Sequence, residues 1–272
     1  MYRALLLALV AAEALQPKST TLGDIVPLVG QDGFVSAMSV PTFACSSLPF
    51  IQSSSPQFKE NLEPLLQQGP AFTLHSLLTR PVCETLITEF EAILGFGSFQ
   101  AGKNHHGALQ IVVPDDTCHI LHDALRPFCG GVGINRRWRV YRYAAGTSQH
   151  FAPHIDAAFP PSGHNGRELI WDISTGTIVS RLTLLIYLND DFVGGETNFY
   201  APQGEILASV RPEAGSCLVF PQAVGEEELD YARLHWPLHE GSPVRSGLRP
   251  KYVIRSDVMF VSDGTKDGIS RD

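Results

Sequence analysis

Several short runs in the second half of the chain alternate apolar and polar residues with a period of two. They cover residues 137–144, 149–156, 180–188, 216–220 and 251–260, and they are rich in β-branched and aromatic side chains. Gly, Pro and Asn-Asp turns separate them. A period of two is that of a strand with one buried face, so this half should fold as antiparallel sheets.

The pattern before residue 130 is helical. Residues 71–78 could form a short strand, and Thr79 can then cap a helix that should stop at Gly95. A second helix should begin after Asp115 and end at Pro127. Helices first and many short strands afterwards indicate an α+β fold with an antiparallel barrel or jelly roll on the C-terminal side.

The remaining segments look like extensions of one domain. Residues 15–70 have little periodicity and several Ser-, Pro- and Gly-rich stretches, which is typical of a leader with few fixed elements. We expect the folded domain at 71–262, followed by a tail at 263–272.

The first fourteen residues resemble a secretory signal peptide. Arg3 precedes the nine apolar residues 4–12, and Ala12 and Ala14 form a small-residue cleavage pattern. We therefore expect entry into the secretory pathway, to the ER lumen or outside the cell. A plastid or another organelle stays open, because Ser, Thr and Lys follow at 18–21.

Composition excludes some classes of function. The net charge is −8 and no dense basic block occurs, so nucleic acid is not an expected partner. No run of about 20 apolar residues predicts a spanning helix. The five cysteines form neither a disulfide framework nor a Cys-x-x-Cys zinc pair.

Three residues form a candidate metal site. His154 and Asp156 lie two apart on a predicted strand and can face one ion, and His239 is a third candidate. Two imidazoles and one carboxylate leave coordination positions open, as in non-haem Fe(II) oxygenases. His-x-Asp alone is a weak signal, because a strand with polar residues facing water gives the same pattern.

Four motifs in order strengthen this interpretation. Residues 140–156, 181–199, 215–222 and 238–260 together resemble the 2-oxoglutarate/Fe(II)-dependent dioxygenase superfamily, and within it the catalytic domains of prolyl 4-hydroxylases. The resemblance implies a double-stranded β-helix, which is a jelly-roll barrel with supporting helices. It also implies that His154, Asp156 and His239 are both the metal ligands and the catalytic centre.

The resemblance implies a cation for the far carboxylate of 2-oxoglutarate. Family spacing points to Arg249, ten residues after His239, whereas the ending Lys-Tyr-x-x-Arg-Ser-Asp points to Lys251. We favour Lys251 and keep Arg249 as the alternative, since both can bind a carboxylate.

Three further residues match positions of the co-substrate pocket in the family. Tyr143 matches a tyrosine whose hydroxyl often contacts the same carboxylate, and Tyr141 is the alternative on the same strand face. Thr183 and Thr197 match positions on strands that line the pocket. A β-favouring Thr packed in a sheet is the simpler explanation for both.

The expected activity is hydroxylation of a C–H bond with Fe(II), 2-oxoglutarate and O₂, and with ascorbate as a helper, releasing succinate and CO₂. The resemblance favours peptidyl proline, while another residue or a small molecule stays open as substrate. Two other classes also stay open: a catalytically dead jelly-roll binding module and a metal-dependent barrel enzyme that does not use 2-oxoglutarate.

Overall fold

The structure is a computed structural model, and it describes residues 22–30, 40–48, 56–63, 65, 69–94, 97–101, 104–223 and 237–262. The N-terminal strands are β1 (Ile25–Pro27), β2 (Val29–Gly30), β3 (Thr42–Cys45), β4 (Gln57–Asn61), β5 (Phe72–His75), β6 (Gly97–Ala101) and β7 (Asn104–Val112). The helices are α2 (Arg80–Leu94) and α3 (Asp115–Cys129).

The later strands are β8 (Gly133–Ile134), β9 (Arg137–Tyr143), β10 (Phe151–His154), β11 (Gly163–His164), β12 (Glu168–Ile170), β13 (Ile178–Tyr187), β14 (Phe192–Gly194), β15 (Thr197–Tyr200), β16 (Ile206–Val210), β17 (Cys217–Pro221), β18 (Leu238–Gly241), β19 (Val244–Gly247) and β20 (Lys251–Val261). All five runs with a period of two therefore form strands, as the sequence predicts.

Two sheets build a barrel. The centre of the larger sheet has the order β9-β20-β13-β17, and the smaller sheet has the order β10-β18-β15-β16. These neighbours are all antiparallel. Along the chain the strands alternate between the sheets, except that β15 and β16 both lie in the smaller one. This strand order is that of a jelly-roll barrel, or double-stranded β-helix, which confirms the expected fold.

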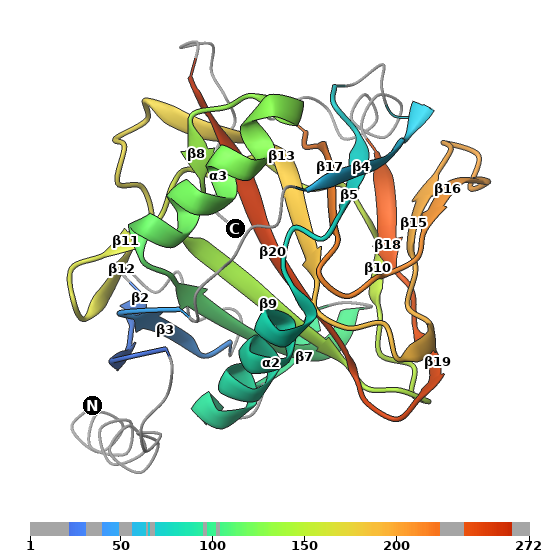
Figure 1. Cartoon of the computed structure of the whole chain (residues 1–272), viewed down its shortest axis with the longest axis horizontal. Helices are drawn as coiled ribbons and strands as arrows, with labels where there is room; N and C mark the ends of the chain where they lie inside the picture. Colours follow the sequence, from blue (N-terminus) through green and yellow to red (C-terminus); the bar gives the residue numbers. More distant parts are fainter. Residues whose placement is uncertain are drawn as a thin grey trace.

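The larger sheet separates two apolar cores, because its side chains alternate between two faces. Ile254 of β20 packs in the cluster that contains Phe90 of α2 and Leu121 of α3. Its neighbour Val253 packs with Tyr143 in the cluster inside the barrel. The two helices thus cover the outer face of the sheet, in front of β20 and β9 in Figure 1. Within the described residues no helix is long and apolar enough to cross a membrane.

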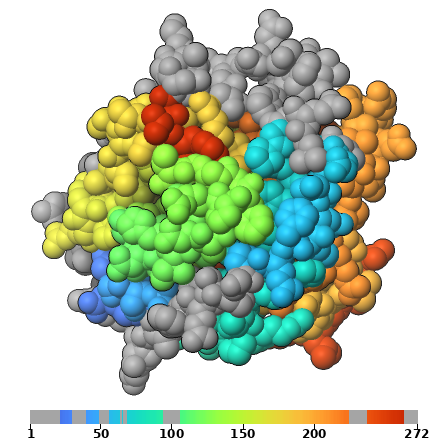
Figure 2. Space-filling model, turned by 45° about the horizontal axis from the view of Figure 1, so that its top comes forward, coloured from blue at the N-terminus to red at the C-terminus, as the bar shows by residue number. Residues whose placement is uncertain are grey.

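The segment at 15–70, expected to have few fixed elements, contributes strands to the larger sheet. β3 pairs in parallel with β7, and all four of its residues are buried. β4 pairs with β5. The Phe58 ring of β4 stacks on the Phe128 ring of α3, with centroids 6.4 Å apart, and its centroid lies 6.3 Å from that of Phe72. Figure 2 shows α3 in green beside β4 and β5 in cyan. These short strands lack a periodic pattern, and β3 is buried on both faces.

One helix boundary differs from the prediction. α3 continues through Pro127 to Cys129, and Gly130, with a φ of 68°, follows it. A proline in the last turn removes only one backbone donor, so the helix continues past it. After the metal-site strand β10, the segment at 160–166 contains β11, which pairs with β12, and β12 pairs with β2. The expected signal peptide at 1–14 and the tail at 263–272 lie outside the described residues.

Candidate metal and co-substrate site

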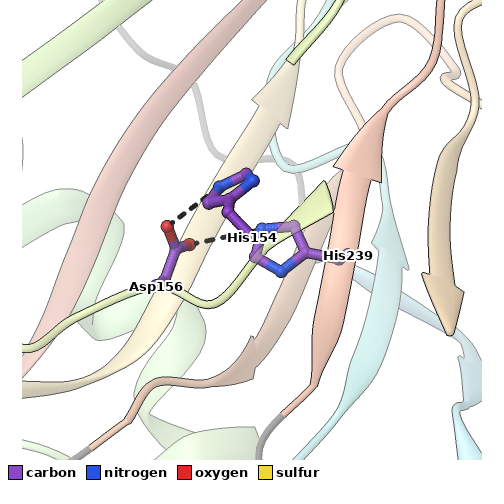
Figure 3. Close-up of side chains that lie close together, drawn as sticks. All are labelled: His154, Asp156 and His239. Carbon is purple, nitrogen blue, oxygen red and sulfur yellow. Dashed lines mark ion pairs between the residues drawn. The ribbon is translucent and has the colours of Figure 1, made fainter. Parts of the chain in front are cut away.

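Three ligand side chains meet where β10 and β18 pair. His154 ends β10 and lies directly opposite His239 of β18 in the strand register. Asp156 follows two residues after the end of β10. Its Oδ1 lies 3.4 Å from His154 Nε2, and its Oδ2 lies 3.6 Å from His239 Nε2 (Figure 3). The three donor atoms lie within 4.8 Å of one another, so they can bind one ion.

Both imidazoles present the same nitrogen to the centre of the site. Nδ1 of His154 lies 2.8 Å from the carbonyl oxygen of Ala152, and Nδ1 of His239 lies 3.0 Å from that of Pro237. A carbonyl only accepts, so each Nδ1 carries the proton and each Nε2 keeps a free lone pair. Burial, and then the neighbouring His154, lower the pKa of His239 to about 3, which keeps this ligand neutral.

The carboxylate of Asp156 is buried but charged. Burial opposes its ionisation, but the positive charge of Arg255 outweighs burial and helps to hold the pKa of Asp156 well below the usual range. Thr183 donates a hydrogen bond of 2.6 Å to its Oδ2. Two neutral nitrogens and one anionic oxygen are a donor set that suits Fe(II) and leaves coordination positions free. The residues present therefore fit the metal that the sequence resemblance implies.

A cavity of about 390 Å³, counting its open mouth, extends from this site to Lys251. Lys251 opens β20, pairs in register with Tyr143 of β9, and is 2% exposed. Its Nζ donates to the carbonyl of Gly195 at 2.7 Å and lies 5.0 Å from the centre of the Tyr143 ring. Burial lowers the pKa of Lys251 to about 7, and the charge of Glu196 opposes this shift without cancelling it.

Two glycines make room at the Lys251 end of the cavity. Gly195 has a φ of 71°, and a Cβ there would lie 3.2 Å from Cδ of Lys251. A Cβ on Gly241 would lie 3.2 Å from the hydroxyl of Tyr143. A side chain at either position would thus press on the cation or the phenol of the pocket.

The structure brings some of the predicted co-substrate residues together and separates others. Tyr143, Tyr141 and Thr197 line the cavity with Lys251. The Thr197 hydroxyl also shares a hydrogen bond of 2.8 Å with Tyr187.

Thr183 and Arg249 lie elsewhere. Thr183 contacts Asp156 from behind and does not line the cavity, so it supports the metal site instead. Arg249 lies at the surface, where it donates to Glu84 and Asp191. The turn between β19 and β20 directs Arg249 outward and leaves the barrel interior to the first residue of β20.

Arg255 is the arginine of the Lys-Tyr-x-x-Arg-Ser-Asp ending, but that motif gave it no role in the site. It lines the cavity, and its Nη2 lies 2.8 Å from Oδ1 of Asp156. The available signal was its spacing, because Arg255 lies four residues after Lys251 on one strand and must share its face.

A comparison with family models agrees with this geometry. Residues 138–256 match the 2OG-Fe(II) oxygenase superfamily. The match begins in β9, ends in β20, and so spans the eight barrel strands and all three ligand residues. The superfamily implies Fe(II), 2-oxoglutarate and O₂, and the His-Asp-His triad that such a site needs is present.

Solved structures of this oxygenase class are similar to the chain at low identity. A viral collagen prolyl hydroxylase from Paramecium bursaria Chlorella virus-1, in its 2OG complex, is 19% identical, and the match covers 71% of this chain and 96% of that chain with a TM-score of 0.42. A prolyl-4-hydroxylase from Pseudomonas putida is 14% identical over 74% of this chain and 97% of that chain, with a TM-score of 0.46. Among curated protein sequences, none matches the chain significantly.

Proposed function

We propose that the protein is a dioxygenase that uses Fe(II) and 2-oxoglutarate to hydroxylate a C–H bond, with peptidyl proline as the substrate. One observation carries the proposal: the His154, Asp156 and His239 triad and the buried Lys251 line a single cavity. A metal at one end and a cation at the other suit a molecule with a keto acid at one end and a carboxylate at the other.

Each residue has a distinct role in this proposal. His154, Asp156 and His239 hold Fe(II), which supplies the redox chemistry that activates O₂ and that amino-acid side chains lack. Lys251, once protonated, pairs with the far carboxylate of 2-oxoglutarate and so fixes the direction in which the keto acid enters.

The walls between the two ends include several apolar side chains. Leu185, Val253 and Phe151 line the cavity beside Tyr143, whose ring lies against the Lys251 ammonium. A poorly hydrated pocket strengthens the ion pair between Lys251 and a bound carboxylate.

The reaction balances without another reductant. One oxygen atom of O₂ enters the substrate as a hydroxyl group. The other enters succinate, as 2-oxoglutarate loses CO₂ and supplies two electrons. Ascorbate is proposed as a helper that keeps the iron reduced between turnovers.

Peptidyl proline rests on the sequence motifs at 140–156 and 238–260, which resemble prolyl 4-hydroxylases. Modification of secreted proteins would agree with the signal-like residues 1–14. N-terminal sequencing of the mature protein tests that location, and an intact Met1 would contradict it.

The first experiment mixes metal-free protein with Fe(II) and 2-oxoglutarate under argon and records the visible spectrum. We expect a metal-to-ligand charge-transfer band that is lost in Asp156→Ala. A proline-rich peptide should then gain one oxygen atom, measured by mass spectrometry, in proportion to the succinate formed. Without a band in the folded protein, the dead binding module becomes the better explanation. A folded His239→Ala variant that still consumes 2-oxoglutarate would contradict the ligand assignment.

A further inference from the structure

A closed ring of polar contacts surrounds the carboxylate of Asp156. Two chains of contacts start at the two carboxylate oxygens of Asp156 and join again behind the metal site. One runs from Oδ1 to Arg255 and on to Asp257, and the other runs from Oδ2 to Thr183 and on to Gln222. Gln222 closes the ring by donating to Oδ1 of Asp257 at 2.8 Å.

Arg255 is the charged member that touches the ligand. Its Nη2 lies 2.8 Å from Oδ1 of Asp156 but does not meet hydrogen-bond geometry, so the contact is an ion pair. The same nitrogen lies 3.8 Å from Oδ1 of Asp257. The Arg255 side chain is only 10% exposed, and both carboxylates are almost completely buried. Water therefore weakens these contacts little.

The partners of Asp257 hold the far side of the ring in place. Its Oδ2 accepts from Arg139 Nη2 at 3.1 Å and from the Asn135 amide at 3.3 Å. With Gln222 on its other oxygen, Asp257 has donors on both sides. Arg255 thus faces, on its far side, a carboxylate that other donors already hold, and its shorter contact is the one to Asp156.

In the second arm of the ring, which runs through Thr183 and Gln222, the neighbouring donors and acceptors determine which group donates each proton. The backbone N–H of Phe159 donates to Ser180, so the Ser180 proton goes to Oε1 of Gln222 at 2.6 Å. The Gln222 amide nitrogen then donates to Thr183 at 3.0 Å, which leaves the Thr183 proton for Asp156. The Gln222 amide gives one of its two N–H groups to Thr183 and the other to Asp257, so every proton in this arm has an acceptor and the arm has one arrangement.

The backbone alone does not fix the orientation of the Asp156 carboxylate. β10 ends at His154, and Asp156 lies beyond the strand. The carbonyl of Asp156 accepts from Ala223, but this contact leaves the side-chain torsions free. An unsupported aspartate could rotate away from the two histidines.

We propose that Arg255 is a positioning residue that holds the Asp156 carboxylate against the two histidine Nε2 atoms so that one divalent metal can bind all three. This inference rests on the proposed metal site and goes beyond it, because it assigns a role to a residue that is neither a metal ligand nor the partner of the far carboxylate.

The test measures Mn(II) affinity of the full chain by electron paramagnetic resonance, with no turnover involved. Arg255→Gln should raise the Mn(II) Kd roughly 10- to 100-fold, as losses of partners that orient metal ligands do. Arg255→Lys keeps the positive charge but shortens its reach, so an intermediate loss would show that geometry matters besides charge.

Arg139→Gln is the matched control. Arg139 is also a buried arginine on Asp257, but it does not contact Asp156. Both glutamine variants should lower the melting temperature, whereas only Arg255→Gln should lose more than about threefold in Mn(II) affinity. The same loss in both would reduce Arg255 to a structural role and overturn the proposal.

Other outcomes separate this inference from the proposed function. Unchanged or tighter Mn(II) binding by Arg255→Gln, with wild-type protein binding normally, would overturn the role of Arg255 alone. A higher Kd for 2-oxoglutarate at saturating Mn(II), without a change in Mn(II) affinity, would make Arg255 a co-substrate residue and also overturn it. Failure of the wild type to bind Mn(II) would overturn both proposals.

Discussion

At the scale of single residues, the two candidate cations lie in opposite environments. Lys251 is buried in the cavity, whereas Arg249 pairs with two surface carboxylates. Lys251→Ala should raise the KM for 2-oxoglutarate roughly 10- to 100-fold, because an ion pair with the buried ammonium contributes about 1.5–3 kcal/mol. Arg249→Ala, the control, should leave this KM within about twofold. The reverse result would show that the far carboxylate binds at Arg249.

Lys251 also makes co-substrate binding depend on pH. Its pKa of about 7 in the free pocket means that the ammonium loses its proton near neutral pH. Below this pKa the cation is already present, while above it each bound 2-oxoglutarate must bring a proton with it. From pH 6.5 to 8.0 the Kd should therefore rise by roughly eightfold.

Lys251→Arg provides the control for this profile, because arginine stays charged throughout the range. Calorimetry at saturating Mn(II) would measure both proteins. Equal pH profiles would exclude Lys251 as the group that titrates.

Sequence reasoning at this scale succeeded where a motif fixes a residue and failed where contacts cross between strands. The spacing of His154 and Asp156 placed both on one strand face, whereas His239 and Lys251 followed from the motifs that resemble the family. Thr183 could not, because its contact with Asp156 depends on how β13 lies beside the end of β10. Arg255 was missed for the same reason, since only the assembled barrel sets it against Asp156.

At the scale of elements, the connection between β14 and β15 shapes the inner end of the cavity. Gly195 lies in this connection, its φ is 71°, and its carbonyl accepts from Lys251. Gly195→Ala should strain the backbone by about 1–2 kcal/mol and crowd Lys251, and so raise the Kd for 2-oxoglutarate. Gly204→Ala is the control, because Gly204 has a φ of 89° but no atom within 4 Å of its Cβ position.

Calorimetry and thermal unfolding separate the two effects in this pair. Both variants should lose similar stability, and only Gly195→Ala should lose affinity. Equal affinities of the two variants for 2-oxoglutarate would show that Lys251 accommodates the added methyl group without weaker co-substrate binding.

Elements with a clear period could be predicted, and short ones could not. β13 and β20 are ten and eleven residues long and contain the predicted runs at 180–188 and 251–260, and α2 has an apolar repeat that ends close to its predicted end. β15, β16 and β18 have four or five residues each, too few for a period to stand out. His106 lies buried in β7, packed on Tyr141 and Phe151, although no period in the sequence around it indicates a strand.

At the scale of the whole molecule, the larger sheet extends on both sides beyond the four strands that it contributes to the barrel. β3 and β1 extend it beyond β7, and β4 extends it beyond β5. Phe43 of β3 belongs to the core beneath the helices, and Leu62, just after β4, belongs to the core inside the barrel. A domain boundary at residue 71 follows the sequence motifs, but it would cut through both cores.

A chain that starts at residue 71 should therefore be less stable than one that starts at residue 22. Losing Phe43 and Leu62 alone removes about 3–6 kcal/mol of apolar burial, which corresponds to a fall in Tm of roughly 10 °C or more. The cut also uncovers the edges of β7 and β5, so the short chain should aggregate on unfolding. Differential scanning calorimetry and light scattering measure both effects.

Phe43→Asp in the longer chain separates lost packing from lost length. Phe43 is 7% exposed, so a carboxylate there would be buried against the apolar core and should cost most of the same stability. If the chain from residue 71 has the same Tm as the longer chain and Phe43→Asp does not lower the Tm, residues 22–70 do not contribute to the stability of the barrel. If both lower the Tm, the N-terminal strands are part of the domain, and a stable form of the protein must include them.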